Sequence, residues 1–385
     1  MFFGRNEEEG LRCVYHGWKF DVTGACVDMP SEPAESNFKS KVRTRAYACQ
    51  ERGGVIWTYM GSREVLPPLP DIEPNMLPEG EYALEKSMRE CNYMQSLEGD
   101  IDTAHLSFLH TGSLKLGDLR PGSYSYYAMK DRSPRYDVID TEYGTSYGTY
   151  RPAEADTTYW RVAHFLMPFY SMIPTGVLGM QIYTRAWVPL DDEHSILWSF
   201  ISLKNPLGAG ENSSNRPANA DNGGGPAQAR ARSGFSSFGE MRPDSSDFLG
   251  KFRPVADNSN DYMIDRDKQS RMESFTGIPT IPLQDQAVTE SMGPIYDRSH
   301  EHLGSTDSMV IRTRRRLIIA AKALRDASVT PPGVDNPEFY ARRSGGVILH
   351  NGVDWQTATR ELQKAFVSHQ GLSEDPFVIP VGAEE

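Results

Sequence analysis

Cysteine is scarce in this chain of 385 residues, which has four, at positions 13, 26, 49 and 91. So few cysteines do not make a disulfide framework, and the cytoplasm is the default location. The sequence also lacks an apolar run long enough to cross a bilayer, and it shows no signal peptide. Its net charge of −12 argues against binding to nucleic acid or to anionic membranes.

Histidine is sparse in the first quarter of the chain, where His16 is the only one before His105. Between residues 92 and 110, Asp102, His105 and His110 then form the pattern D-x2-H-x4-H. We expect a helix here, because residues three apart are neighbours on a helix and Asp102 and His105 would share one face. His110 would follow near the helix end. Neutral imidazole is the commonest protein ligand for metals, so the pattern suggests a metal site.

Two histidine ligands from one segment need a third ligand from elsewhere. A carboxylate would complete the 2-His-1-carboxylate triad of non-haem Fe(II) oxygenases. A second helix is expected from Ile281, with Pro282 in its first turn, and it offers Asp285 and Glu290. Spacing alone does not choose between these two carboxylates. Taken alone, the histidine pair is about as often made of core or surface residues as of ligands.

A second motif lies near the N-terminus, where a strand-like stretch over residues 11–16 leads into a tight turn. The pattern is C-x2-H-G-W-K-F-D-x2-G, beginning at Cys13. A lone C-x2-H means little, since Cys13 could be a buried thiol and His16 a surface residue. The longer pattern is far more specific.

This segment resembles the second half of a Rieske [2Fe–2S] motif, C-x-H … C-x2-H, in which one iron has two Cys ligands and the other two His. Together with residues 92–110, it resembles the Rieske non-haem iron ring-hydroxylating oxygenases, α subunit, and most closely the phthalate 4,5-dioxygenase-like group. The resemblance implies an α+β fold. A small all-β Rieske domain over residues 1–63 would precede a helix-grip (StAR-related-like) catalytic domain with an antiparallel sheet over 64–385. Residues 205–239, rich in Gly, Asn and Ser, are expected to form a flexible insertion.

The resemblance also implies two cofactors. Mononuclear Fe(II) would be held by His105, His110 and Asp285, because Asp285 stands where the family places its carboxylate ligand. Cys13 and His16 would be half of the ligand set of a [2Fe–2S] cluster. The other pair, C-x-H, is expected upstream of Cys13, and no cysteine lies there. We therefore expect an N-terminally truncated chain, from a mis-started gene model or a natural fragment.

In the resembling enzymes, a carboxylate at the position of Asp102 bridges an iron-ligating histidine, here His105, to a Rieske histidine of the neighbouring subunit. A head-to-tail trimer is implied. The alternative for Asp102 is a capping carboxylate without a role in electron transfer. A reductase carrying flavin or an iron–sulfur centre is the expected electron donor.

The function implied is that of a terminal oxygenase component, which inserts oxygen from O2 into an aromatic substrate by cis-dihydroxylation or by monooxygenation with O-dealkylation. The group commonly takes aromatic carboxylates, which calls for an arginine in the pocket. Arg161 and Arg185, on strand-like stretches, are the candidates, although strand arginines usually point to solvent. Two other hypotheses stay open: a zinc-type hydrolase with the same His pair but without H-E-x-x-H, and a non-catalytic helix-grip ligand-binding protein.

A long helix expected from residue 308 to about 325 carries a basic cluster: Arg312, Arg314, Arg315 and Arg316. This cluster could dock an acidic electron donor by electrostatic steering. A solvated helix face is the more common meaning of such a cluster.

Overall fold

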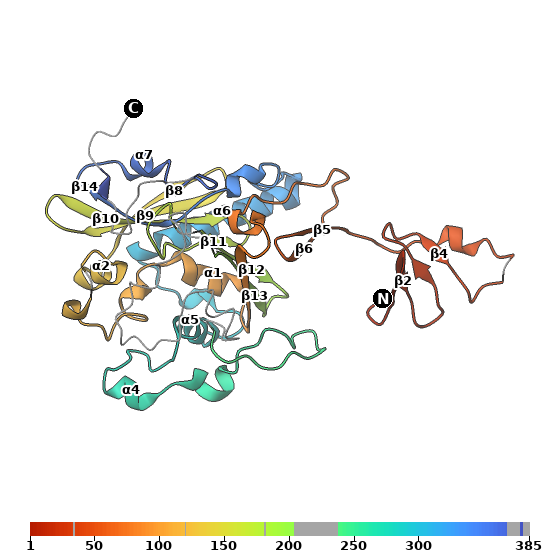
Figure 1. Cartoon of the computed structure of the whole chain (residues 1–385), viewed down its shortest axis with the longest axis horizontal. Helices are drawn as coiled ribbons and strands as arrows, with labels where there is room; N and C mark the ends of the chain where they lie inside the picture. Colours follow the sequence, from red (N-terminus) through yellow and green to blue (C-terminus); the bar gives the residue numbers. More distant parts are fainter. Residues whose placement is uncertain (34, 120, 181, 204–237, 368–377, 380–385) are drawn as a thin grey trace. The chain divides into compact units, whose positions relative to one another are not determined.

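The structure is a computed structural model, and it describes residues 1–33, 35–119, 121–180, 182–203, 238–367 and 378–379 (Figure 1). The chain divides into two compact units, Met1–Leu66 and Pro67–Glu385. The insertion expected at residues 205–239 lies, apart from its last two residues, outside the described ranges.

The first unit is built from short antiparallel strands. Four of them form one sheet in chain order: β1 (Arg5–Glu7), β2 (Gly10–Arg12), β3 (Lys19–Phe20) and β4 (Cys26–Asp28). A short 3-10 helix, η1 (Phe38–Lys41), is followed by a separate hairpin, β5 (Ala48–Arg52) and β6 (Val55–Tyr59).

The strand expected over residues 11–16 ends at Arg12. Residues 13–17 instead form a turn, in which the Gly17 N–H donates to the Cys13 carbonyl at 3.0 Å. Gly17 has a φ of +75°, a conformation that glycine adopts without the steric cost of a Cβ. Cys13 and His16 therefore sit on the loop between β2 and β3.

The second unit is organised around a nine-stranded sheet. Its path runs β15-β14-β10-β11-β12-β13-β7, with β9 on the other side of β10 and β8 beside β9. All pairs are antiparallel except β14 with β15. The strands are β7 (Tyr82–Arg89), β8 (Arg135–Asp140), β9 (Gly144–Pro152), β10 (Thr157–Leu166), β11 (Tyr170–Met172), β12 (Tyr183–Pro189), β13 (Ser195–Ser202), β14 (Gly345–His350) and β15 (Val378–Ile379).

Helices cover one face of this sheet (Figure 1). Leu97 and Ile101 of α1 (Tyr93–Ile101) and Met309 of α6 (Ser308–Ala327) pack in one core cluster with strand residues such as Phe165 and Trp187. Each fully buried side chain of this size contributes about 1.5–3 kcal/mol. The antiparallel sheet packed on helices is the α+β, helix-grip arrangement that the sequence predicted.

The remaining described helices are short. They are α2 (Tyr124–Lys130), α4 (Arg266–Ser270), α5 (Ile281–Glu290), α7 (Trp355–Thr359) and the 3-10 helices η2 (Glu73–Met76), η3 (His105–Ser107), η4 (Leu116–Asp118), η5 (Asn258–Met263), η6 (Arg298–His300), η7 (Ser305–Asp307) and η8 (Pro337–Tyr340). Helix α5 begins as predicted, with Thr280 as N-cap and Pro282 in the first turn. No helix in the described ranges is both long and apolar enough to cross a membrane.

Candidate iron centre

The spacing led us to expect a single helix in the segment that carries the histidine pattern, and the structure does not have one there. Helix α1 ends at Ile101, and Asp102 is extended, with φ −89° and ψ 130°. The Asp102 carboxylate accepts from the N–H groups of Ala104 at 2.7 Å and His105 at 3.2 Å. These bonds favour a turn over continuation of the helix. The short Asp side chain takes nearby backbone N–H groups that helical hydrogen bonds would otherwise use. His105 then opens η3, and His110 lies in the turn beyond it.

Two imidazoles and one carboxylate nevertheless converge on one point. His105 Nε2 lies 3.2 Å from His110 Nε2. Asp285 Oδ1, from α5, lies 3.1 Å from His110 Nε2 and 3.7 Å from His105 Nε2. In the part of the chain that the structure describes, this is the only group of three or more His, Cys, Asp or Glu close enough to hold a metal ion.

Glu290, the other carboxylate considered on α5, points elsewhere. One of its oxygens accepts the N–H of Glu90 at 2.9 Å, and the other accepts the Tyr262 hydroxyl at 3.0 Å. Glu290 is buried, and burial raises the pKa of its carboxyl. The geometry therefore favours Asp285 as the third ligand.

Each histidine is held by a hydrogen bond at Nδ1, the outer ring nitrogen that faces away from the shared point. His105 Nδ1 lies 3.0 Å from Asp102 Oδ2, and His110 Nδ1 lies 2.8 Å from Gln284 Oε1. The Gln284 amide nitrogen donates to the Ile278 carbonyl at 3.1 Å, so its oxygen is free to accept from His110. Both Nδ1 atoms thus carry the proton, and both Nε2 lone pairs face the shared point, as metal-ligating histidines require.

The pKa of each carboxyl group of the site, Asp102 and Asp285, lies below its ordinary value. Burial alone would raise the pKa of Asp102, but the hydrogen bonds that it accepts from the His105 ring and from the backbone of Ala104 and His105 bring this pKa below its ordinary value. Burial would likewise raise the pKa of Asp285, and the neighbouring His110 and His105 lower it. An ionised Asp285 is the form that can ligate a cation.

The donor set fits a borderline divalent metal. Metal–ligand bonds of about 2.1 Å place neighbouring ligand atoms about 3.0–3.4 Å apart, close to the separations found here. Two imidazoles and one carboxylate on one side of the ion leave other positions open, which is the arrangement of non-haem Fe(II) oxygenases.

The site opens into a pocket of about 350 Å³, which His105, Asp285 and Asp102 line. Its apolar walls come from several elements: Leu109, Trp187, Leu197, Phe238, Val288 and Met292. The lining also includes charged side chains, among them four arginines, so the pocket combines apolar walls with polar groups that can orient a small molecule.

The two arginines named from the sequence lie in different places. Arg185 lines this pocket and forms an ion pair with Asp100 at 2.5 Å. Arg161 is buried, donates to the Pro174 carbonyl at 2.8 Å and to the Thr103 hydroxyl, and does not line the pocket. Neither one points to bulk solvent, which is the common alternative for strand arginines.

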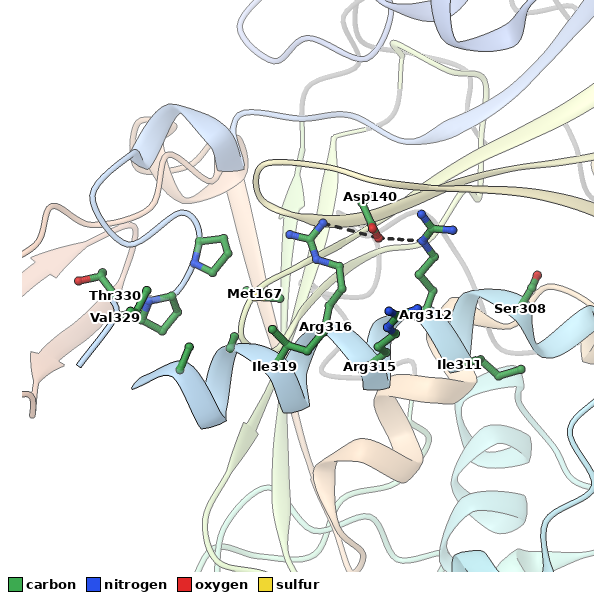
Figure 2. Close-up of a pocket in the computed structure, with 14 residues that line it drawn as sticks. Asp140, Met167, Ser308, Ile311, Arg312, Arg315, Arg316, Ile319, Val329 and Thr330 are labelled. Atoms are coloured by element: carbon green, nitrogen blue, oxygen red, sulfur yellow. Dashed lines mark hydrogen bonds and ion pairs between the residues drawn. The ribbon is translucent and has the colours of Figure 1, made fainter. Parts of the chain in front are cut away.

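A larger groove of about 750 Å³ runs along α6 and is not a candidate for the iron centre, because its lining has no His or Cys and a single acid, Asp140. Figure 2 shows Arg312 and Arg316, one helical turn apart, reaching the Asp140 carboxylate. Arg314 is paired with Glu98 at 2.6 Å. The basic cluster of α6 is therefore largely neutralised by acids of its own unit.

Comparisons with known proteins agree with this geometry. Residues 2–46 match the family model of the Rieske [2Fe-2S] domain, and residues 58–376 match the LigXa C-terminal domain like family. The chain is 42% identical to the 3-chlorobenzoate-3,4-dioxygenase oxygenase subunit of Comamonas testosteroni, over 93% of this chain and 80% of that protein. The chain belongs to the Rieske oxygenases.

Other Rieske oxygenases are also similar to it. The phthalate 4,5-dioxygenase oxygenase subunit of Pseudomonas putida is 32% identical, over 92% of this chain and 77% of its own length. A crystal structure of dicamba monooxygenase bound to 3,6-dichlorosalicylic acid aligns with a TM-score of 0.49 at 15% identity, covering 84% of this chain and 83% of that one.

As a Rieske oxygenase, the protein is an oxidoreductase of a family that uses a [2Fe–2S] cluster and a mononuclear iron. A zinc-type hydrolase and a non-catalytic binding protein do not agree with this membership. The sequence supplies Cys13 and His16, whereas a Rieske cluster takes two cysteines and two histidines. Cys26, in β4, is a buried thiol that donates to the Asp28 carbonyl at 3.4 Å.

Sequence reasoning did not find Gln284 or Tyr136. The Tyr136 hydroxyl donates to Asp102 Oδ1 at 3.2 Å and accepts the Thr103 N–H at 3.1 Å. The only signal for Gln284 was its position next to Asp285, and a polar residue at a helix start has many ordinary explanations.

Gln284→Leu is expected to weaken Fe(II) binding about 10- to 100-fold, because His110 loses the acceptor that fixes its tautomer and ring orientation. Competition with a chromophoric chelator under nitrogen measures this affinity. The matched control is Gln356→Leu, at an exposed position of α7. Equal Fe(II) affinity in wild type and Gln284→Leu would contradict the role of Gln284.

Proposed function

We propose that His105, His110 and Asp285 hold the catalytic iron of an oxygenase component that acts on an aromatic carboxylate. The observation that carries the assignment is the convergence of two Nε2 lone pairs and one carboxylate oxygen beside a pocket lined by both apolar and charged side chains. Bound Fe(II) would activate dioxygen beside the substrate. The substrate class is supported by the names of the two relatives, one a chlorobenzoate and the other a phthalate dioxygenase subunit.

The chain's own residues position the reaction. Trp187, Leu197 and Phe238 are buried walls that would orient an aromatic ring and exclude water from it. Asp102 and Gln284 keep the proton of each ligating histidine on the outer nitrogen, so that both inner nitrogens stay available to the metal. Dihydroxylation and monooxygenation with O-dealkylation are both compatible with this arrangement.

Asp102 is further proposed to continue the hydrogen-bonded path from His105 toward the Rieske unit of a neighbouring subunit, in a trimer. The exposure of the pair supports this proposal. The Asp102 and His105 side chains are each 24% exposed, so a group from outside this unit could reach them. A reductase carrying flavin or an iron–sulfur centre is the proposed electron donor. A cytoplasmic location, expected from the few cysteines, stays a prediction.

His105→Ala is expected to abolish both product formation and binding of the mononuclear iron, because one of three protein ligands is removed. Turnover is measured with an aromatic acid, dioxygen and a reductase, and iron is measured on the same preparation. His302→Ala, at an exposed histidine, is the matched control. Full turnover by His105→Ala would refute the assignment.

A further inference from the structure

Together with several carboxylates, four arginines line the pocket beside the iron ligands: Arg89, Arg185, Arg298 and Arg314. Three of them are neutralised within the chain. Arg185 pairs with Asp100 at 2.5 Å. Arg298 and Arg314 share two glutamates, Glu98 and Glu301, at distances between 2.5 and 2.8 Å. Arg89 remains, and among the described residues it has no carboxylate partner.

Arg89 is the last residue of β7 and is 2% exposed. Its guanidinium is held mainly through Nη1, which donates to Ser87 Oγ at 2.7 Å, to the Met88 carbonyl at 3.1 Å and to Gln286 Oε1 at 3.2 Å. Nη2 makes one long contact, to the Pro282 carbonyl at 3.4 Å. The nearby acid, Glu290, is reached only through Gln286, whose amide nitrogen donates to Glu290 at 3.1 Å. Within the described ranges, no acceptor is found for Arg89 Nε.

Aromatic rings complete the surroundings of Arg89. Its guanidinium carbon lies 5.7 Å from the centroid of Trp187 and 5.4 Å from that of Phe238. Burial lowers the pKa of Arg89. The charge of Glu290 opposes this effect, but among the described residues no carboxylate forms an ion pair with Arg89 directly. A buried cation without a directly paired carboxylate is costly, whereas a carboxylate ligand would supply that partner and take paired hydrogen bonds from a planar guanidinium.

We propose that Arg89, rather than Arg161 or Arg185, binds the substrate carboxylate in this pocket. The inference rests on the proposed function, because it identifies the residue that recognises the acid. Arg89 and Asp285 line the same pocket, so an acid held by Arg89 against Trp187 and Phe238 would lie in the pocket into which the iron ligands open. Arg185 is less suited, because Asp100 already neutralises it.

The experiment compares benzoate with benzamide, which has nearly the same shape and no charge, by calorimetric titration of iron-loaded protein without oxygen. Wild type is expected to bind benzoate at least about 10-fold more tightly than benzamide. Arg89→Gln should bind benzoate about 10- to 100-fold more weakly than wild type, as for a lost charge-assisted hydrogen bond, and bind benzamide within twofold of wild type. Arg89→Lys should keep part of the preference.

The control variant is Arg325→Gln, at an exposed arginine outside the pocket, and it should bind both ligands like wild type. Equal binding of benzoate and benzamide by wild type would refute the aromatic-acid proposal itself. A full benzoate preference in Arg89→Gln would refute the role of Arg89 and leave the substrate class standing. Equal loss of both ligands in Arg89→Gln and Arg89→Lys would also overturn the inference, because it would indicate a role in pocket shape alone.

Discussion

Asp102→Asn is expected to lower kcat about 10- to 100-fold. Four donors meet the two Asp102 oxygens: the Ala104 N–H and Tyr136 hydroxyl at Oδ1, and the N–H and ring Nδ1 of His105 at Oδ2. An amide offers one oxygen and one NH2 group, so two of these donors would face an NH2. Either the turn before His105 or the His105 ring then loses its acceptor.

The variant separates the two roles considered for Asp102. If Asp102 also links His105 to an electron source, kcat falls by a larger factor than Fe(II) affinity does, and both are measured on one preparation. Asp118→Asn, at an exposed acid of η4, controls for the loss of one negative charge. An unchanged kcat in Asp102→Asn would contradict both roles.

Glu73→Ala is expected to destabilise the second unit by about 3–5 kcal/mol. Glu73 of η2 forms a two-point ion pair with Arg343, at 2.6 and 2.8 Å, and both side chains are at most 4% exposed. Glu73 also accepts the Phe366 N–H at 2.9 Å. Removing the carboxylate leaves a buried guanidinium without its counter-charge. Urea unfolding followed by tryptophan fluorescence measures the loss.

A second variant tests whether the loss of stability comes from the unpaired buried charge of Arg343. Glu73→Leu combined with Arg343→Met removes both charges, and it should be less destabilised than Glu73→Ala, because no uncompensated ion remains. Glu361→Ala, which breaks an exposed pair with Lys364, should cost less than about 1 kcal/mol. A Glu73→Ala variant as stable as Glu361→Ala would contradict this account.

The local strand pattern was predictable, and the path of the sheet was not. Alternating aromatic and β-branched residues in β9, β10 and β12 identified these strands from the sequence. Strand β10, however, pairs with β14, which follows it by almost 180 residues. No local pattern contains such a pairing, because it depends on which surfaces are buried together.

The structure brings the three predicted iron ligands together, although the backbone that carries the histidines differs from the expectation. His105 and His110 could be named from their spacing, and Asp285 from the family resemblance, because few residue types ligate iron. The expected helix over residues 92–110 failed because Asp102 turns its carboxylate back onto the N–H groups that follow it. Arg89 was not singled out, because the sequence does not show which pocket arginines form ion pairs within the chain. That distinction needs the positions of Asp100, Glu98 and Glu301.

The ligand set itself is tested most directly by measuring how much iron exceeds acid-labile sulfide. A [2Fe–2S] cluster contains equal numbers of iron and sulfide, so this difference counts only the mononuclear iron. The count is made on protein loaded with Fe(II) without oxygen, for wild type, Asp285→Ala and Glu290→Gln. We predict one such iron per chain in wild type and in Glu290→Gln, and none in Asp285→Ala. The same count in Asp285→Ala as in wild type would contradict the assignment of Asp285, and with it the proposed centre.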